Sequence, residues 1–130
     1  SRPIDLQTVA AGSPSTVASG TPSARRYPWG DTGAVCRRAA WGLATGPCAT
    51  DGTGPDTVGA HADGATDRGI FDMAGNAAEW VAAGPDPKKG VARGGSWRTA
   101  LATELRTWQS LELDPSAKDD RVGARCAYDP

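Results

Sequence analysis

The stretch that decides the fold is Gly69-Ile70-Phe71-Asp72-Met73-Ala74-Gly75-Asn76-Ala77-Ala78-Glu79-Trp80. Its apolar start predicts a strand that runs into a Gly-Asn turn. A tight loop would bring the Asp72 and Glu79 carboxylates together with the carbonyl oxygens of Gly75 and Ala77. Such hard oxygen ligands suit Ca²⁺, with waters or further carbonyls completing about six to eight ligands. Alternatively, Asp72 and Asn76 satisfy backbone groups of the turn, and Glu79 is solvated.

The composition around this stretch is poor in aliphatic residues. Leu, Ile, Val and Phe together supply 16 of the 130 residues, whereas there are five Trp, 17 Gly and 10 Pro. Large aromatic side chains therefore replace part of an aliphatic core, and many turns are expected. The length predicts one domain. A formal net charge of −1 disfavours binding to nucleic acid or anionic membranes, and no apolar run is long enough to span a bilayer.

The chain divides into an N-terminal segment and a domain. Residues 1–24 combine a possible short helix at 4–11 with a Gly/Ser/Pro/Thr-rich loop at 12–23. The domain, 25–130, is irregular at first and then contains short strand candidates. The last two candidates are the most plausible pair of neighbours in a sheet. These candidates are 69–73, 79–82, 91–94, 104–113 and 122–128.

The three cysteines constrain the chemistry. None belongs to a Cys-x-x-Cys pair, and His61 is the one histidine, so a zinc site is not expected. Closing the Cys36–Cys48 loop as a disulfide would stabilise the fold by about 3 kcal/mol. The alternative is two reduced thiols in a cytosolic protein. The disulfide interpretation predicts an extracytoplasmic protein, with Cys126 left over.

Four motifs together resemble the formylglycine-generating-enzyme (sulfatase-modifying factor) superfamily, a branch of the C-type-lectin fold. They occur in the family's order and cover residues 25 to 128. The motifs are Arg26-Tyr27-Pro28-Trp29-Gly30-Asp31, the Gly69–Trp80 stretch, Val91-Ala92-Arg93-Gly94-Gly95-Ser96-Trp97 and Asp120-Arg121-Val122-Gly123-Ala124-Arg125-Cys126. The resemblance implies an α+β, loop-rich, C-type-lectin-like fold with little regular secondary structure. The N-terminal half of the family's domain is absent, so the chain either sits against a companion chain that carries that half or folds alone as a minimal version.

The resemblance also implies metal and catalytic residues. Family members hold calcium at positions that match Asp72, Gly75, Ala77 and Glu79, which favours a structural calcium site here. A second family calcium site has no matching Asn in this chain. The catalytic members bind copper through two thiolates, and the corresponding positions are Thr99 and Glu104. Copper binding and oxidase chemistry are therefore not expected, and one histidine does not suffice for the family's iron-dependent branch.

The region after Ser96 forms the substrate groove or variable binding surface in the resembling proteins. Residues here of the kinds that contact ligands are Trp97, Arg98, Glu104, Arg106, Trp108 and Gln109. The leading hypothesis is a non-catalytic, calcium-stabilised binding module for a protein, peptide or glycan. One alternative is a formylglycine-generating oxidase completed by a missing chain, and the other is a structural subunit of an extracellular assembly. For Trp97 itself, core packing is the competing interpretation.

Overall fold

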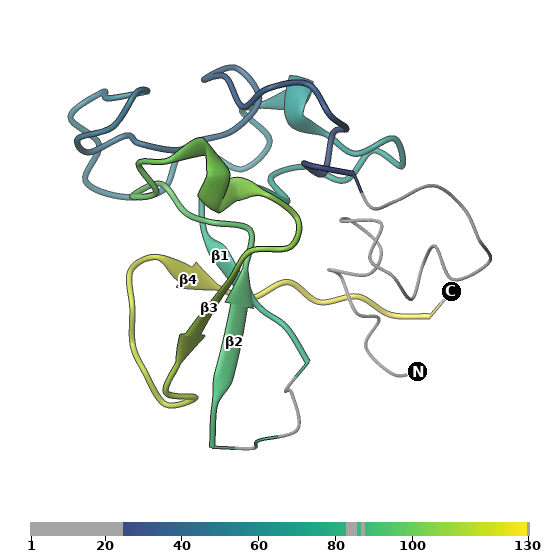
Figure 1. Ribbon diagram of the computed structural model, residues 1–130, viewed down its shortest axis with the longest axis vertical. Coiled ribbons are helices and arrows are strands. Elements are labelled where there is room, and N and C mark those ends of the chain that lie inside the picture. The colour runs from purple at the N-terminus through teal and green to yellow at the C-terminus, as the bar shows by residue number, and fades with distance from the viewer. Residues whose placement is uncertain (1–24, 83–85, 87, 130) are drawn as a thin grey trace.

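The computed structural model describes residues 25–82, 86 and 88–129, which form a small sheet beneath a layer of irregular loops (Figure 1). The sheet contains β1 (Ala78–Trp80), β2 (Gly90–Arg93), β3 (Ser110–Leu113) and β4 (Val122–Gly123). Two single-turn 3₁₀ helices, η1 (Ala62–Gly64) and η2 (Ala102–Leu105), lie in the loop layer. The α+β, loop-rich fold class expected from the sequence is confirmed. The helix and loop expected within 1–24 lie outside the described residues.

The sheet has the strand order β3-β2-β1-β4. β2 pairs antiparallel with both β1 and β3, and β4 adds to β1 in parallel. Arg93 lies opposite Glu79 on one side and Ser110 on the other. The C-terminal end of β2 therefore lies between Glu79 in β1 and the start of β3.

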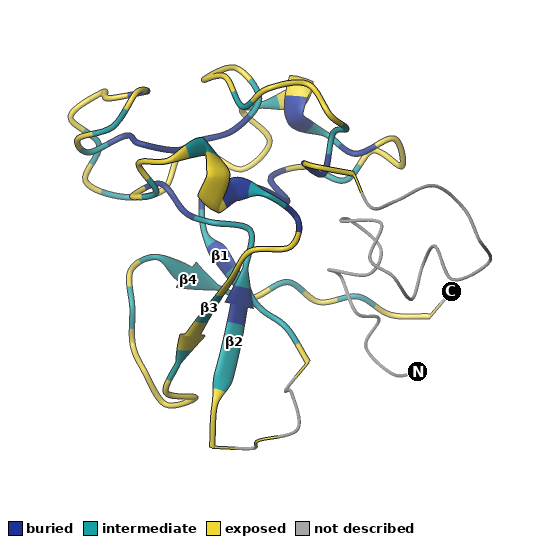
Figure 2. Ribbon diagram, in the orientation of Figure 1, coloured by how far each residue is buried: buried dark blue, intermediate teal, exposed yellow. Residues whose placement is uncertain are grey.

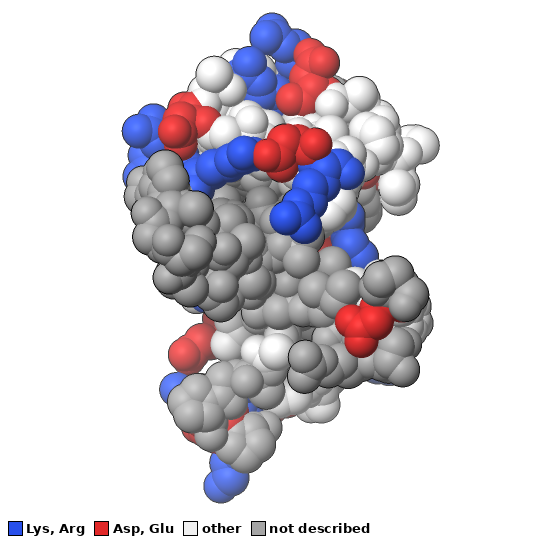
Figure 3. All heavy atoms as spheres, turned by 90° about the vertical axis from the view of Figure 1, so that its right-hand side faces the viewer, with Lys and Arg blue, Asp and Glu red and all other residues white. Residues whose placement is uncertain are grey.

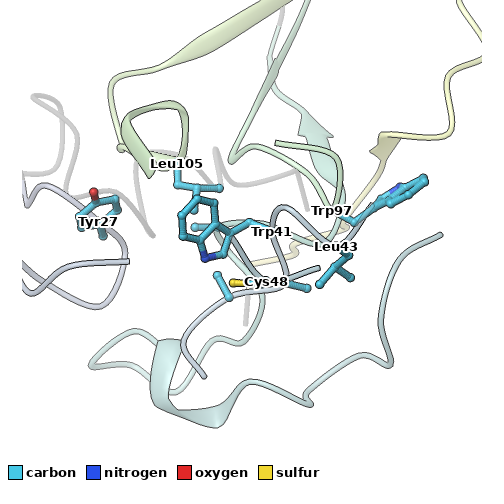
Figure 4. Packing of buried hydrophobic residues seen from close by; sticks show 9 residues of the cluster. Tyr27, Trp41, Leu43, Cys48, Trp97 and Leu105 are labelled. Atoms are coloured by element: carbon cyan, nitrogen blue, oxygen red, sulfur yellow. The ribbon is translucent and has the colours of Figure 1, made fainter. Parts of the chain in front are cut away.

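Most of the buried residues lie in the loop layer and at the end of β2 that meets it (Figure 2). Figure 4 shows the resulting hydrophobic cluster, which combines aromatic side chains with few aliphatic ones. Tyr27 also stacks on Trp29, with ring centroids 4.9 Å apart. Aromatic rings thus fill the space that aliphatic residues fill in other cores, as the composition predicted. The cluster is formed by Tyr27, Ala39, Ala40, Trp41, Leu43, Cys48, Ala74, Trp97 and Leu105.

The strand candidates 79–82, 91–94 and 122–128 overlap β1, β2 and β4, although β4 ends at Gly123. The other candidates differ from the structure. Residues 69–73 form no strand, because Gly69 and Asp72 have φ of 78° and 56° and bend the backbone. The candidate 104–113 divides into the end of η2 and β3. The expected pairing of the last two candidates is also wrong, since β3 and β4 lie at opposite edges of the sheet.

The cysteine prediction is confirmed. Cys36 and Cys48 form a disulfide with a Cα–Cα distance of 5.5 Å, and Cys126 is a free, exposed thiol. The bridge fixes the irregular segment beside Leu43, whose carbonyl accepts hydrogen bonds from the amides of Thr50 and Gly52. No helix among the described residues is long and apolar enough to cross a membrane.

Candidate functional site

The Gly-Asn turn is held by hydrogen bonds to three other loops. The Asn76 amide donates to the Ala40 carbonyl at 2.7 Å, and the Asn76 carbonyl accepts from the Trp97 amide at 2.8 Å. The Asn76 side-chain oxygen accepts from the amide of Asp56 at 2.7 Å. At Gly75, φ is 74° and an added Cβ would lie 2.5 Å from the Ala40 oxygen, so only glycine fits there. The turn is therefore the point at which the surrounding loops are joined.

The two carboxylates of the turn have different partners. Asp72 is buried, and its Oδ2 accepts a hydrogen bond from the Gly59 amide at 2.6 Å. Glu79 pairs with Arg125, whose Nη2 and Nε lie 2.7 and 3.0 Å from Oε1. The side chains of Glu79 and Arg125 are only 12% and 26% exposed. The alternative of a solvated Glu79 is therefore wrong, whereas Asp72 does satisfy a backbone group.

One oxygen of Glu79 has no partner among the described residues. Its Oε2 is buried and accepts no hydrogen bond from them. Burial raises the pKa of the Glu79 carboxyl above its usual range, against the opposing effect of the Arg125 guanidinium. A buried carboxylate oxygen of this kind fits a hard cation, because Ca²⁺ takes oxygen ligands.

Side chains alone do not complete a metal site at this turn. Within the described part of the chain, no group of three or more His, Cys, Asp or Glu side chains is placed to hold a metal ion. A calcium ion would therefore depend on the main-chain oxygens of Gly75 and Ala77 as well as on Asp72 and Glu79. This is the donor set that the sequence suggested, and the unpartnered Glu79 oxygen is the feature that fits it.

A cavity of about 250 Å³ opens between the sheet and the loop that follows Gly94. The C-terminal end of β2 and the start of β3 form one wall, and η2 contributes Glu104. The polar side chains that line it come from Arg93, Ser96, Thr99, Glu104, Gln109, Ser110 and Arg121. Concave sites with a few convergent polar groups are where proteins commonly bind small ligands.

Two residues of the predicted ligand surface, Glu104 and Gln109, line this cavity. Arg98 does not line it. Its guanidinium binds Asp120 at 2.7 and 3.2 Å and lies 4.3 Å from the centre of the Trp97 ring. Arg98 is thus an exposed residue that covers a core indole.

Trp97 is a correction to the predicted ligand surface. It is 1% exposed, and its Nε1 donates to the Asp120 carbonyl at 3.1 Å. An indole buried in this way has no surface to offer to a ligand, so the competing interpretation of Trp97 as a core residue is the right one. The chain just before the indole is also closely packed, since a Cβ at Gly95 would lie 2.6 Å from the Leu105 side chain.

Arg106, which is half-buried, and Trp108, which is exposed, form a separate pair outside the cavity lining. The Trp108 side chain is 52% exposed, and the Arg106 guanidinium lies 5.5 Å from the centre of its ring. Aromatic and arginine side chains of this kind are frequent contact residues at protein surfaces. The structure therefore places the predicted ligand residues in two groups rather than on one continuous face.

The predicted ligand residues do not include five polar residues that line the cavity: Arg93, Ser96, Thr99, Ser110 and Arg121. The register pairs Arg93 with Ser110, but no local pattern showed that β3 would lie against β2 there. Arg93 and Arg121 belong to two of the motifs quoted above, but a motif position alone does not show that a side chain faces a cavity. The tertiary pairing of strands, which single-sequence patterns do not encode, was the missing information.

A second concavity lies beside the disulfide. It is lined by the bridge, the 50–56 segment and His61. The His61 ring lies 3.0 Å from the Asp56 carboxylate, and the Thr57 amide and His61 lower the pKa of Asp56. The contact holds the loop that also donates to Asn76 and Asp72, which gives this pair a structural role.

Opposite charges are interleaved on the face shown in Figure 3, where Lys and Arg atoms lie next to Asp and Glu atoms over the loop layer. Five arginines of the described chain form ion pairs with an aspartate or glutamate: Arg25, Arg37, Arg98, Arg121 and Arg125. The other five arginines of the described chain form no ion pair within it: Arg26, Arg38, Arg68, Arg93 and Arg106. Of these five, Arg93 lines the cavity.

Comparisons with known proteins agree with this architecture. The sequence model of the family described as "Sulfatase-modifying factor enzyme 1-like domain" matches residues 11–130. Among solved structures, PvdO from Pseudomonas aeruginosa is similar with a TM-score of 0.62 and 20% identity, and CarF with 0.60 and 22%. These matches cover 95% and 96% of this chain but 50% and 45% of those proteins, so the chain spans about half their length. No curated protein sequence matches the chain significantly. The protein belongs to the sulfatase-modifying factor enzyme 1-like domain family.

Proposed function

We propose that this domain is a non-catalytic binding module, stabilised by calcium, whose ligand site is the cavity between β2, β3 and η2. The observation that carries the proposal is the cavity itself. Its size suits a small ligand or one side group of a larger ligand. Among the described residues, its lining contains arginine, glutamate, glutamine and hydroxyl groups but no cysteine or histidine.

The non-catalytic part of the proposal rests on the chemistry of the lining. The copper-dependent enzymes that this sequence resembles use two thiolates, and Thr99 and Glu104 stand at those positions in the cavity. Hydroxyl and carboxylate oxygens are hard ligands and do not select Cu(I). The free thiol of Cys126 is exposed near the C-terminus and does not line the cavity.

The calcium part rests on the buried, unpartnered Oε2 of Glu79. When bound, calcium would neutralise the carboxylates of the turn and cross-link its main-chain oxygens. Asp72, Gly75, Ala77 and Glu79 would hold it, and Arg125 would keep the other oxygen of Glu79 in place. Ala78, which directly follows the turn, and Gly94 line the cavity. A turn made rigid by calcium would therefore also hold this part of the cavity in place.

A protein, peptide or glycan ligand would extend beyond the cavity to the half-buried Arg106 and the exposed Trp108. A stacked arginine and a half-exposed indole can contact a flat or apolar ligand group. The Cys36–Cys48 disulfide supports an oxidising, extracytoplasmic location for such a module.

We also propose that a companion segment, equivalent to the other half of the solved relatives, packs against this chain. The support is the 45 to 50% coverage of those structures together with the short strand β4, which lies at the edge of the sheet among the described residues. A stoichiometric second chain or segment in native mass measurements of the purified protein would support this, and a monomer with full ligand binding would contradict it.

The binding proposal is tested by nuclear magnetic resonance titration of the isotope-labelled 130-residue chain with a set of small polar fragments. We expect shifts that cluster at Ala92, Gly94, Gly95 and Ser110. The substitution Ser110→Trp fills the cavity and should abolish these shifts, whereas Ala117→Trp, at an exposed position outside the lining, should not. Shifts that are spread over the surface or are unchanged by Ser110→Trp would refute the proposal. Stoichiometric Cu(I) binding with oxygen consumption on a cysteine-containing peptide would favour the oxidase instead.

A further inference from the structure

We infer that the cavity binds a dipolar ligand group that carries a carboxylate and an ammonium, as an amino acid or a peptide terminus does. This inference rests on the proposed binding function of the same cavity and adds the chemical class of its ligand. Its basis is a pair of opposite charges, Arg93 and Glu104, that the described residues leave without ionic partners.

The first charge is the guanidinium of Arg93. The side chain is half-buried, and Nη1 donates to the Thr107 carbonyl at 3.3 Å. None of the described residues binds its Nε and Nη2. These two nitrogens form the edge of a guanidinium that binds a carboxylate through two parallel hydrogen bonds. Arg93 is thus fixed through one nitrogen and can offer the other two to a carboxylate.

The second charge is the carboxylate of Glu104. The chain contains three glutamates, and two of them are paired, Glu79 with Arg125 and Glu112 with Lys89. Within the described chain, Glu104 has no basic partner, although it lines the cavity. It lies in η2, three residues before the carbonyl that holds Arg93, and both residues line the same cavity. Glu104 is therefore placed to accept hydrogen bonds from a cationic ligand group.

The other charged residue of the cavity is already neutralised. Arg121 binds Asp119 through Nη2 at 2.7 Å and Nε at 2.9 Å. The lining therefore offers one positive and one negative charge, and a ligand with a single charge would leave the other one unmatched. Hydroxyl and amide groups of Thr99 and Gln109 add neutral hydrogen-bonding capacity.

The size of the cavity limits the ligand group. About 250 Å³ holds a small molecule or one residue of a peptide rather than an extended chain. A matched series of four-carbon probes tests the charge requirement directly: 4-aminobutyrate carries both charges, butyrate and butylamine carry one each, and butyramide carries none. Binding of each probe to the 130-residue chain is measured by resonance titration of the cavity amides.

We expect 4-aminobutyrate to bind about tenfold more tightly than any of the other three probes, because each charge-assisted contact contributes on that scale. Arg93→Gln and Glu104→Gln should each remove this advantage. The matched controls Arg98→Gln and Glu112→Gln, which lie outside the lining, should retain it. If Arg93→Gln unfolds the chain, Glu104→Gln still decides the result, and Arg93→Lys should weaken binding because a lysine has no two-nitrogen edge.

The outcomes separate this inference from the proposed function. Equal affinity for the dipolar and neutral probes, with shifts still at the cavity, would overturn the ligand class while leaving the binding function intact. An advantage of 4-aminobutyrate that survives Glu104→Gln would also overturn it. If none of the probes or fragments shifts the cavity amides, both the ligand class and the proposed function are refuted.

Discussion

Arg125 and Glu79 lie 46 residues apart in the sequence, yet their side chains form two hydrogen bonds of 2.7 and 3.0 Å. The same guanidinium donates to the carbonyls of Phe71 and Asp72, at 2.7 and 3.2 Å. One side chain that follows β4 therefore holds both the start of the turn and its carboxylate. This contact joins the parallel edge strand to the loop layer.

The substitution Arg125→Gln should destabilise the chain by about 3 to 5 kcal/mol, because it leaves a buried carboxylate without its counter-charge. It also removes the donors to the Phe71 and Asp72 carbonyls. The free energy of unfolding is measured by urea titration followed through tryptophan fluorescence.

A matched control for this change is Arg98→Gln. The Arg98–Asp120 pair has similar hydrogen bonds, but its side chains are 49% and 56% exposed. Solvent screens an exposed pair, so the control should change the free energy of unfolding only slightly. Equal losses in the two variants would show that the burial of Glu79 does not set the strength of its pair.

Calcium should raise the free energy of unfolding of the wild-type chain by about 2.7 kcal/mol at a concentration about 100-fold above its Kd, because the ion binds only the folded turn. Glu79→Gln should largely abolish the response, since Oε2 is the unpartnered oxygen in the turn. Thermal unfolding with calcium, and again after chelation, measures the effect. Glu112→Gln is the control, and a response that survives Glu79→Gln would place the ion elsewhere.

The family and the turn could be predicted from sequence because they depend on local requirements. Gly75 must adopt a positive φ against the Ala40 carbonyl, and Asn76 must bond to three loops, so these residues form a recognisable motif. The Cys36–Cys48 bridge was also predictable, because a short loop and a pair of cysteines suffice to suggest it.

The position of the ligand residues could not be predicted in the same way. A run such as 97–110 does not show which side chains the next strand will cover. The packing of Trp97 beneath Asp120 and the placement of Arg93 beside Thr107 depend on contacts 23 and 14 residues apart. The apolar residues around Phe71 are typical of a strand, and the sequence does not show that Gly69 and Asp72 adopt positive φ and bend the backbone there.

Removal of the disulfide by the double substitution Cys36→Ala and Cys48→Ala should lower the free energy of unfolding by about 3 kcal/mol. The bridge closes a segment with a sequence separation of 12, and it restrains the unfolded chain more than the folded one. Urea titration of the double variant against the wild-type protein measures the loss.

The control for the disulfide is Cys126→Ser, which removes the exposed free thiol. It should leave the free energy of unfolding nearly unchanged, and a reducing agent should destabilise this variant as much as the wild-type protein. If Cys126→Ser removed the sensitivity to reduction, the stabilising bridge would involve Cys126 rather than the Cys36–Cys48 pair.

Acid should lower the free energy of unfolding because it protonates Asp119. Hydrogen bonds from the Arg121 side chain and amide lower the pKa of Asp119 to about 2. Because the folded pKa lies below the unfolded value of about 3.9, the stabilisation is present above pH 3.9 and is lost as the pH falls through about 2. Asp119→Asn should therefore be less stable than wild type at about pH 6, and the difference should shrink between about pH 4 and about pH 2. Asp129→Asn, at an exposed position, serves as the control. A difference that stayed constant over this range would mean that Asp119 acts through its hydrogen bonds to the loop and not through its charge.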